Sequence, residues 1–370
     1  MPLSKIRPQR ARSVSPELLE AAAAVSDEKE KAMGSRARQR VLMTALMGGA
    51  AVAGATLTRR YRRDLAHAWA RLAAVDRRVA STASGDVEYA ERGNGEPLLV
   101  VHGIFHGCDG GLLSTGVLPQ DRRLIAPSRF GYLGSPLPPG ATPAQQADAF
   151  AALLDELAVD RTDVVGISAG TTSALQLALR HPDRVKHLVV ISGNLPGNPT
   201  AVAPPAWARV FYADLPLWAM KVFAPRAYRH LMGVPKDLPV SGEAAAFVDQ
   251  MAESIFPMAP RAAGGTFDAF VSNPDVNDYP LEAITVPTLL VHAQDDPLIS
   301  YDAAERAAGR IPGARFVTLP SGGHLLLGQD DVVRPAISAF LAEPITTPDT
   351  GANGSDDGNH IQPDARSVPA

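Results

Sequence analysis

The sequence predicts an α/β fold with a mostly parallel, eight-stranded sheet that carries helices on both faces. Between residues 80 and 343, short apolar runs alternate with helical segments, the pattern of strands joined by crossover helices. Most of these runs are continuously apolar, as is typical of strands buried on both faces. The composition, 46% hydrophobic and 20% charged, allows a sizeable core and excludes a wholly disordered or collagen-like chain.

The N-terminal part differs in charge from the rest. Residues 1–80 carry 16 Lys and Arg against 7 Asp and Glu, a net +9, whereas the remainder carries 19 against 32, a net −13. Residues 1–40 are polar, and we expect them to be disordered. Residues 41–58 run for 18 residues without a charge between two arginine-rich stretches, about the minimum length for a bilayer span. We therefore expect a membrane-anchor helix; a cleaved export signal and a soluble alanine-rich helix, with a cytoplasmic location, are the alternatives.

The strands can be placed in chain order. The first two are expected to form an antiparallel hairpin through Ser84-Gly85-Asp86, since Gly and Asp favour such turns. The eight expected strands are RRVAST, VEYAERG, PLLVVHG, RLIAPS, DVVGIS, KHLVVIS, TLLVHA and RFVTLP.

The helices between them have recognisable starts. Thr142-Pro143-Ala-Gln145 is typical of a capping box with proline at the first helical position, and predicts a helix to about Leu157. Further helices are expected at residues 171–180, 301–308 and 331–341. Residues 195–285 break the alternation, because they hold helical segments and no clear strand, and we expect them to form a helical cap. The tail, residues 344–370, is rich in Pro, Gly, Asp and Ser and is expected to be disordered.

Ser168 is the candidate nucleophile. Gly166-Ile-Ser168-Ala-Gly170 follows an apolar strand and opens a helix, the strand–turn–helix context that a nucleophile elbow requires. The serine occupies a strained turn, where side chains at the flanking glycine positions would clash with neighbouring backbone.

To act as a nucleophile, a serine hydroxyl needs a base, and that base is itself oriented by a carboxylate. His324 lies in a glycine-rich loop after the last strand, whereas His292 lies within a strand and is expected to be packed in the core. Asp296, before Pro297, is the expected acid, with Asp295 as its rival. The order is therefore serine, acid, histidine.

With these residues, the chain resembles an α/β-hydrolase fold serine hydrolase over residues 80–343. The resemblance extends to Val101-His102-Gly103-Ile104 and implies that the backbone N–H groups of Ile104 and Ala169 form the oxyanion hole. The segment APSRFGYLGS is similar to the family's Asp-x-Arg-Gly-x-Gly-x-Ser segment, with Ser128 where an acidic residue is usual. Residues 195–285 correspond to the family's cap.

We expect a serine hydrolase that needs no cofactor or metal and cleaves an ester or related acyl bond of an apolar small molecule or lipid. Carbon–carbon hydrolysis, acyl transfer, cofactor-free haloperoxidation and non-catalytic ligand binding are the alternatives. His102, His106 and Asp109 have a metal-like spacing, but they lie on a strand-to-loop turn rather than on a helix, so we expect no metal site there. No nucleic-acid motif is present. Aromatic and methionine residues of the cap could form an acyl pocket or the lid's own core: Trp207, Phe211, Trp218, Met220, Phe223, Tyr228, Phe256 and Met258.

Overall fold

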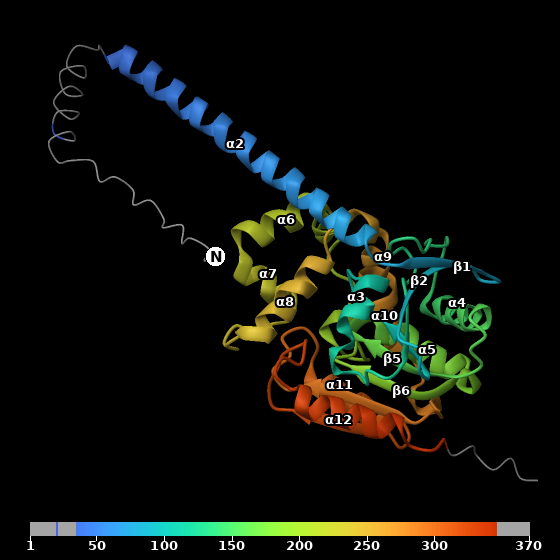
Figure 1. Cartoon of the computed structure of the whole chain (residues 1–370). Helices are drawn as coiled ribbons and strands as arrows, with labels where there is room; N and C mark the ends of the chain where they lie inside the picture. The colour runs from blue at the N-terminus through green and yellow to red at the C-terminus, as the bar shows by residue number, and fades with distance from the viewer. Residues whose placement is uncertain (1–19, 21–34, 346–370) are drawn as a thin grey trace, which may run out of the picture. The chain divides into compact units, whose positions relative to one another are not determined.

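The computed structural model describes residue 20 and residues 35–345. The chain divides into two compact units, of which the first ends at Ala66 and the second begins at His67. The sheet and the helices that cover it belong to the second unit (Figure 1).

The apolar segment 41–58 lies within one long helix, α2 (Ser35–Ala73). Helix α2 begins before the apolar run, and residues 35–40 include Arg, Ala and Gln, which are strong helix formers. Within the described part of the chain, no helix is both long enough and apolar enough to cross a membrane. The rest of the N-terminal segment, apart from residue 20, and nearly all of the predicted tail lie outside the described residues.

The sheet has eight strands in the order β1-β2-β4-β3-β5-β6-β7-β8. The first strand pairs antiparallel with the second and the second antiparallel with the fourth, while all other neighbours are parallel. This confirms the predicted sheet. The strands are β1 (Arg77–Thr82), β2 (Gly85–Arg92), β3 (Pro97–Val101), β4 (Arg123–Pro127), β5 (Thr162–Ile167), β6 (Val185–Ile191), β7 (Thr288–Ala293) and β8 (Arg315–Leu319).

Successive residues of the central strands enter two different cores, because side chains alternate between the faces of a sheet. Leu99 and Val164 belong to the core that includes residues of α4 (Pro143–Glu156), α5 (Thr171–Arg180) and α11 (Tyr301–Arg310). Leu98 and Val165 belong to the opposite core, with residues of α3 (Cys108–Leu113) and α12 (Asp330–Leu341). Helices therefore cover both faces, and Figure 1 shows α4 and α5 side by side on one of them.

The predicted capping box is confirmed. The Thr142 hydroxyl accepts the Gln145 N–H while the Gln145 side chain accepts the Thr142 N–H, and Pro143 is the first helical residue. Short helical turns link the larger elements: η1 (Ser114–Val117), η2 (Ser168–Gly170) and η3 (Pro182–Arg184).

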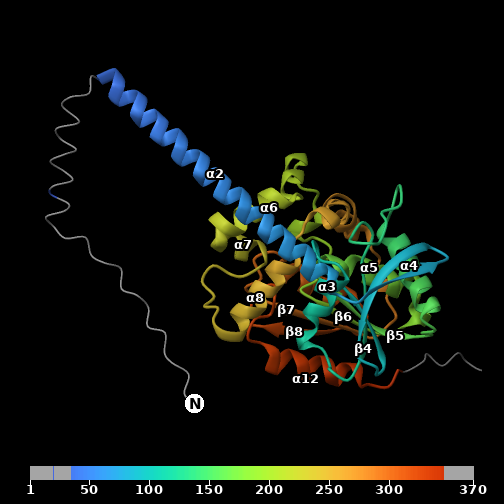
Figure 2. The same cartoon turned by 45° about the horizontal axis from the view of Figure 1, so that its top comes forward.

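All helices between β6 and β7 belong to one insertion, and the described residues there contain no strand, as predicted for residues 195–285. Figure 2 shows α6, α7 and α8 grouped together in this insertion, which we call the cap. Its elements are η4 (Pro199–Ala201), η5 (Ala206–Phe211), α6 (Asp214–Phe223), α7 (Pro225–Leu231), α8 (Gly242–Ser254), η6 (Ala259–Arg261), α9 (Ala262–Phe267), the π-helical turn η7 (Asp268–Ser272), α10 (Asn273–Asp275), η8 (Val276–Asp278) and η9 (Leu281–Ala283).

Candidate active site

Ser168 occupies a strained turn between β5 and α5. Its φ of 51° lies in the left-handed region that non-glycine residues rarely adopt. The flanking glycines are required by space: a Cβ on Gly166 would lie 2.8 Å from the Ala174 Cβ, and one on Gly170 only 2.3 Å from the Val101 carbonyl oxygen. The turn therefore has the geometry expected of a nucleophile elbow.

The loop after β3 lies against this turn. A Cβ on Gly103 would be 3.2 Å from the Ser168 Cβ and 3.7 Å from its Oγ, so the loop passes close to the serine and a side chain here would be tightly packed against it. Ile104 follows Gly103, and Phe105 then adopts a φ of 66°. The structure thus brings the two chain segments that contain Ile104 and Ala169 together at the serine.

His324 and Asp296 meet at the carboxyl end of the sheet. The His324 Nδ1 donates to the Asp296 Oδ2 at 2.8 Å, and the Asp296 Oδ1 accepts the N–H groups of Leu298 and Ile299 at 2.8 and 3.0 Å. The Asp296 side chain is 0% exposed and that of His324 is 10% exposed. Burial by itself raises the pKa of Asp296, but His324 and the two N–H groups outweigh it, so the pKa is below its usual value and the carboxyl is ionised at neutral pH.

The rival carboxylate, Asp295, points to different partners. It accepts the N–H groups of Gly322 and Gly323, at 3.3 and 2.8 Å, and so supports the loop before His324 rather than the imidazole. His292 is buried, and its Nε2 lies 3.2 Å from the Ile299 carbonyl oxygen, in agreement with the predicted core position.

Ser168, Asp296 and His324 each follow a strand of the same parallel part of the sheet. Among the described residues, no hydrogen bond joins Ser168 to His324. Ser168 follows β5, Asp296 follows β7 and His324 follows β8, and these strands are parallel in the order β5-β6-β7-β8. Their carboxyl ends therefore lie at the same edge, where open α/β sheets bind ligands.

A buried polar cluster supports the loop after β3, and sequence reasoning missed it. The Tyr132 hydroxyl accepts a hydrogen bond from the Phe105 N–H at 3.2 Å and donates one to the Asp268 carboxylate. Asp268 also accepts hydrogen bonds from both terminal nitrogens of Arg129, at 2.6 and 2.5 Å. Burial and the neighbouring Asp268 raise the pKa of Tyr132 well above its usual value, so the hydroxyl remains a donor. The only sequence signal was an acidic residue within the otherwise apolar Phe267–Phe270 stretch.

His102 belongs to the same support. Its Nδ1 donates to the Gly103 carbonyl at 2.8 Å, its Nε2 accepts the Arg129 N–H at 3.0 Å, and its ring packs edge-on against Tyr132. Burial and the charge of Arg129 hold the His102 pKa well below its usual value, so the imidazole is neutral. Both ring nitrogens are used by the backbone, and the described residues contain no group of three or more potential metal-ligating side chains.

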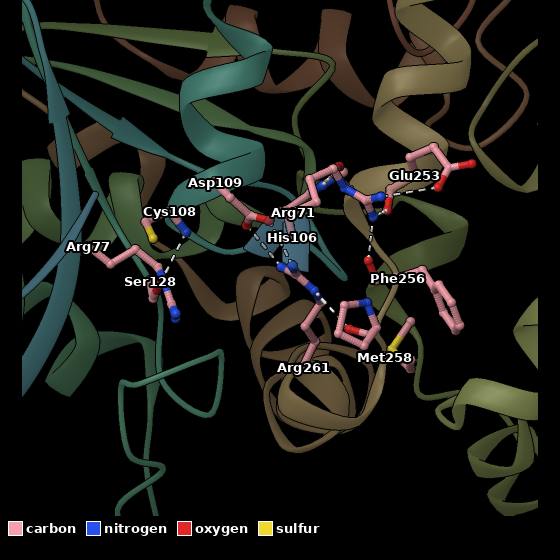
Figure 3. Close-up of polar contacts among 12 residues, drawn as sticks. Arg71, Arg77, His106, Cys108, Asp109, Ser128, Glu253, Phe256, Met258 and Arg261 are labelled. Atoms are coloured by element: carbon pink, nitrogen blue, oxygen red, sulfur yellow. Dashed lines mark hydrogen bonds and ion pairs between the residues drawn. The ribbon is translucent and has the colours of Figure 1, made fainter. Parts of the chain in front are cut away.

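A carboxylate does lie beside Ser128, although the segment's own acidic residue is replaced. The Ser128 hydroxyl donates to the Glu88 Oε2 at 2.9 Å and accepts the Cys108 N–H at 3.1 Å (Figure 3). Glu88 lies on β2, is buried, and accepts from the Arg77 guanidinium at 2.8 Å and the Gly134 N–H at 3.1 Å. A neighbouring strand thus supplies the carboxylate.

Polar contacts attach the cap to the start of α3. Figure 3 shows the Arg261 guanidinium reaching Asp109, with two hydrogen bonds of 3.0 and 2.8 Å. The His106 Nδ1 lies 3.1 Å from the Ser254 hydroxyl. Burial, followed by the charge of Arg261, lowers the pKa of His106 to about 4, so the ring is neutral at neutral pH.

The cap also contacts the loop of the candidate base. The His324 N–H donates to the Gly233 carbonyl at 3.0 Å, and a Cβ on Gly233 would lie 2.1 Å from the His324 Cβ. The aromatic and methionine residues named above differ in burial, and Met220 is half-buried. Trp218, Tyr228, Phe256 and Met258 are buried, whereas Trp207 is 69% and Phe223 64% exposed.

Comparisons with known proteins agree on one family. A family model of the alpha/beta hydrolase fold matches residues 96–331. The provisionally named carbamate hydrolase RutD of Caulobacter vibrioides is 33% identical over 210 residues, which cover 55% of this chain and 74% of that protein. The 2-hydroxymuconate semialdehyde hydrolase of Pseudomonas putida is 28% identical over 239 residues, which cover 63% and 82%. The solved alpha/beta hydrolase fold protein from Nakamurella multipartita is similar with a TM-score of 0.59 at 28% identity, covering 72% of this chain and 99% of that one.

Proposed function

Because the chain belongs to the α/β-hydrolase family, we propose that it is a serine hydrolase that cleaves an ester or related acyl bond of an apolar small molecule or lipid. The observation that carries this proposal is the hydrogen bond from His324 to the buried Asp296, at the same sheet edge as the strained turn of Ser168. A nucleophile, a base and an acid are then all supplied by the chain itself, so the reaction needs no cofactor.

The catalytic role of His324 follows from which of its ring nitrogens is not bonded to Asp296. With its Nδ1–H donated to the ionised Asp296, the His324 imidazole has its Nε2 as the basic nitrogen. That nitrogen takes the Ser168 proton as Oγ attacks the substrate carbonyl carbon. The N–H groups of Ile104 and Ala169 stabilise the oxyanion, and such donors are commonly worth about 10²–10³ in kcat each.

The second half of the reaction returns the enzyme to its starting state. His324 gives the proton to the leaving alcohol as the carbon–oxygen bond breaks, which leaves an acyl group on Ser168. Water then attacks this acyl group and transfers a proton to His324. The acid departs, and the proton returns to the serine oxygen.

The experiment that tests this proposal is labelling with a fluorophosphonate probe, which reacts with activated serines. Full-length protein and the control Ser173→Ala, which removes another buried hydroxyl on α5, should both be labelled. Ser168→Ala should not be labelled and should have no activity on p-nitrophenyl esters of graded chain length. Equal labelling of Ser168→Ala would overturn the assignment of the nucleophile.

Carbon–carbon bond hydrolysis is a second candidate, because one relative at 28% identity is named a 2-hydroxymuconate semialdehyde hydrolase. The same three residues would serve that reaction. The two candidates are separated by comparing kcat/KM for p-nitrophenyl esters with kcat/KM for 2-hydroxymuconate semialdehyde. A higher value for the semialdehyde would replace the ester proposal while keeping the catalytic residues.

A further inference from the structure

An open groove lies between the cap and the loop after β4, and none of its lining residues belongs to the proposed catalytic group. It encloses about 530 Å³, within the usual range for small-molecule sites. Its walls are mostly apolar, and the apolar residues that line it include Leu137, Pro138, Phe267, Phe270 and Val271.

The groove contains one cation, Arg209. Its guanidinium stacks on the Phe270 ring, 4.2 Å from the centroid. Among the described residues, no acidic side chain forms an ion pair with Arg209. Nearby acids have other partners: Asp268 receives Arg129, and the Asp214 Oδ1 accepts the N–H groups of Met258 and Ala259. The guanidinium of this exposed residue therefore lines the groove without an acidic partner among the described residues.

Tyr212 adds a second donor to the same groove. Burial raises its pKa to about 12, an effect that Asp268 increases and Arg209 opposes, so the phenol stays protonated at neutral pH. Its ring lies 5.3 Å from that of Phe105, and both rings pack against the backbone of Gly265, where a Cβ would meet them at 3.0 and 3.1 Å. Tyr212 thus forms the wall between the groove and the loop that contains Ile104.

From this arrangement we propose that the groove is a binding site for an apolar carboxylic acid, distinct from the catalytic residues. Arg209 and Tyr212 bind the carboxylate, because a guanidinium and a hydroxyl are both donors and a carboxylate only accepts. The phenyl and aliphatic side chains bind the hydrocarbon part. A neutral ligand of the same shape would leave the cation without a partner, so the site discriminates by charge.

The test measures binding in the full-length Ser168→Ala protein, which removes turnover, so that the result does not depend on whether the protein is an ester hydrolase. The probes are 4-phenylbutyrate and its neutral analogue 4-phenylbutanol, titrated by calorimetry at low salt. The carboxylate should bind at least about tenfold more tightly than the alcohol, and this preference should decrease as salt is added.

Two variants place the site. Arg209→Gln should reduce carboxylate affinity to about that of the alcohol, whereas Arg226→Gln, which changes an exposed arginine of α7 outside the groove, should leave it unchanged. Val271→Asp, at an exposed position of the groove wall, should weaken the carboxylate more than the alcohol by repulsion. Circular dichroism and melting temperature show that each variant is folded. Equal affinity for the two probes, or carboxylate binding that survives both Arg209→Gln and Val271→Asp, overturns the proposal.

Discussion

The adjacent carboxylates Asp295 and Asp296 allow a sharp test of the acid, because a single amide substitution can be made at each. In Asp296→Asn, the amide oxygen can keep accepting the N–H groups of Leu298 and Ile299, so the NH₂ group faces the His324 Nδ1. Because NH₂ is a donor, it favours the imidazole tautomer whose proton is on Nε2. That tautomer cannot take the proton of Ser168.

The expected loss can be given a size. In serine proteases the corresponding substitution lowers kcat about 10⁴-fold, which is about 5.5 kcal/mol of transition-state stabilisation. Asp296→Asn should show a loss of that order with an ester substrate. Asp295→Asn keeps an oxygen for the shorter bond, to the Gly323 N–H, and should lose less than about tenfold in kcat and about 0.5–1.5 kcal/mol of unfolding free energy.

Steady-state kinetics measure kcat and KM, and urea unfolding shows whether each variant is folded. If Asp295→Asn is the inactive variant and Asp296→Asn works normally, the assignment of the acid is reversed. If both keep most of their kcat, the serine–histidine–aspartate mechanism must be abandoned.

Four further outcomes are expected. Tyr132→Phe removes both hydrogen bonds of the buried hydroxyl and should lower the unfolding free energy in urea by about 1–3 kcal/mol and reduce kcat more than it changes KM. Gly166→Ala should lower the unfolding free energy in urea by about 1–3 kcal/mol because the added methyl group overpacks the turn. Gly116→Ala, where a Cβ meets nothing within 4 Å, should stay near wild type in the same urea titration. Burial, with a smaller contribution from nearby carboxylates, raises the pKa of Cys108 to about 12, so iodoacetamide at pH 8 should modify it only after unfolding, as mass spectrometry can show. The pKa of His106 is lowered in the folded state, so its contribution to stability is complete above about pH 6.5 and is lost as the pH falls toward 4. The loss is at most about 1.4 kcal/mol per pH unit. In urea titrations, the unfolding free energy of His106→Gln should therefore fall less between pH 7 and pH 5 than that of the unchanged protein.

The strands of the sheet could be predicted from the sequence because the patterns that indicate them are local. The strands are continuous apolar runs between turn residues, and helix α5 begins and ends where its pattern predicts, at Thr171 and Arg180. The serine turn could also be placed, because the two glycines mark the points where neighbouring backbone comes within about 3 Å of the missing Cβ.

Contacts between distant segments could not be predicted in the same way. Arg129 and Asp268 are 139 positions apart, and neither has a local pattern that selects the other. The left-handed turns at Phe105 and Leu133 lack glycine, the usual signal for such a conformation, because the surrounding packing holds them. The groove around Arg209 depends on how the cap folds back, which periodicity does not reveal.

Glu88 supplies a carboxylate beside Ser128, the position where similar sequences usually have an acidic residue, and this affects how such sequences diverge. An acid at both positions would place two negative charges in one buried space, and an acid at neither would leave the Arg77 guanidinium and the Gly134 N–H without their acceptor. Substitutions at these two positions should therefore be epistatic, because the effect of each depends on which residue occupies the other position. Across related sequences we expect the pair to covary, so that a single acidic residue stands at one or the other of the two positions and keeps the Arg77 guanidinium and the Gly134 N–H paired.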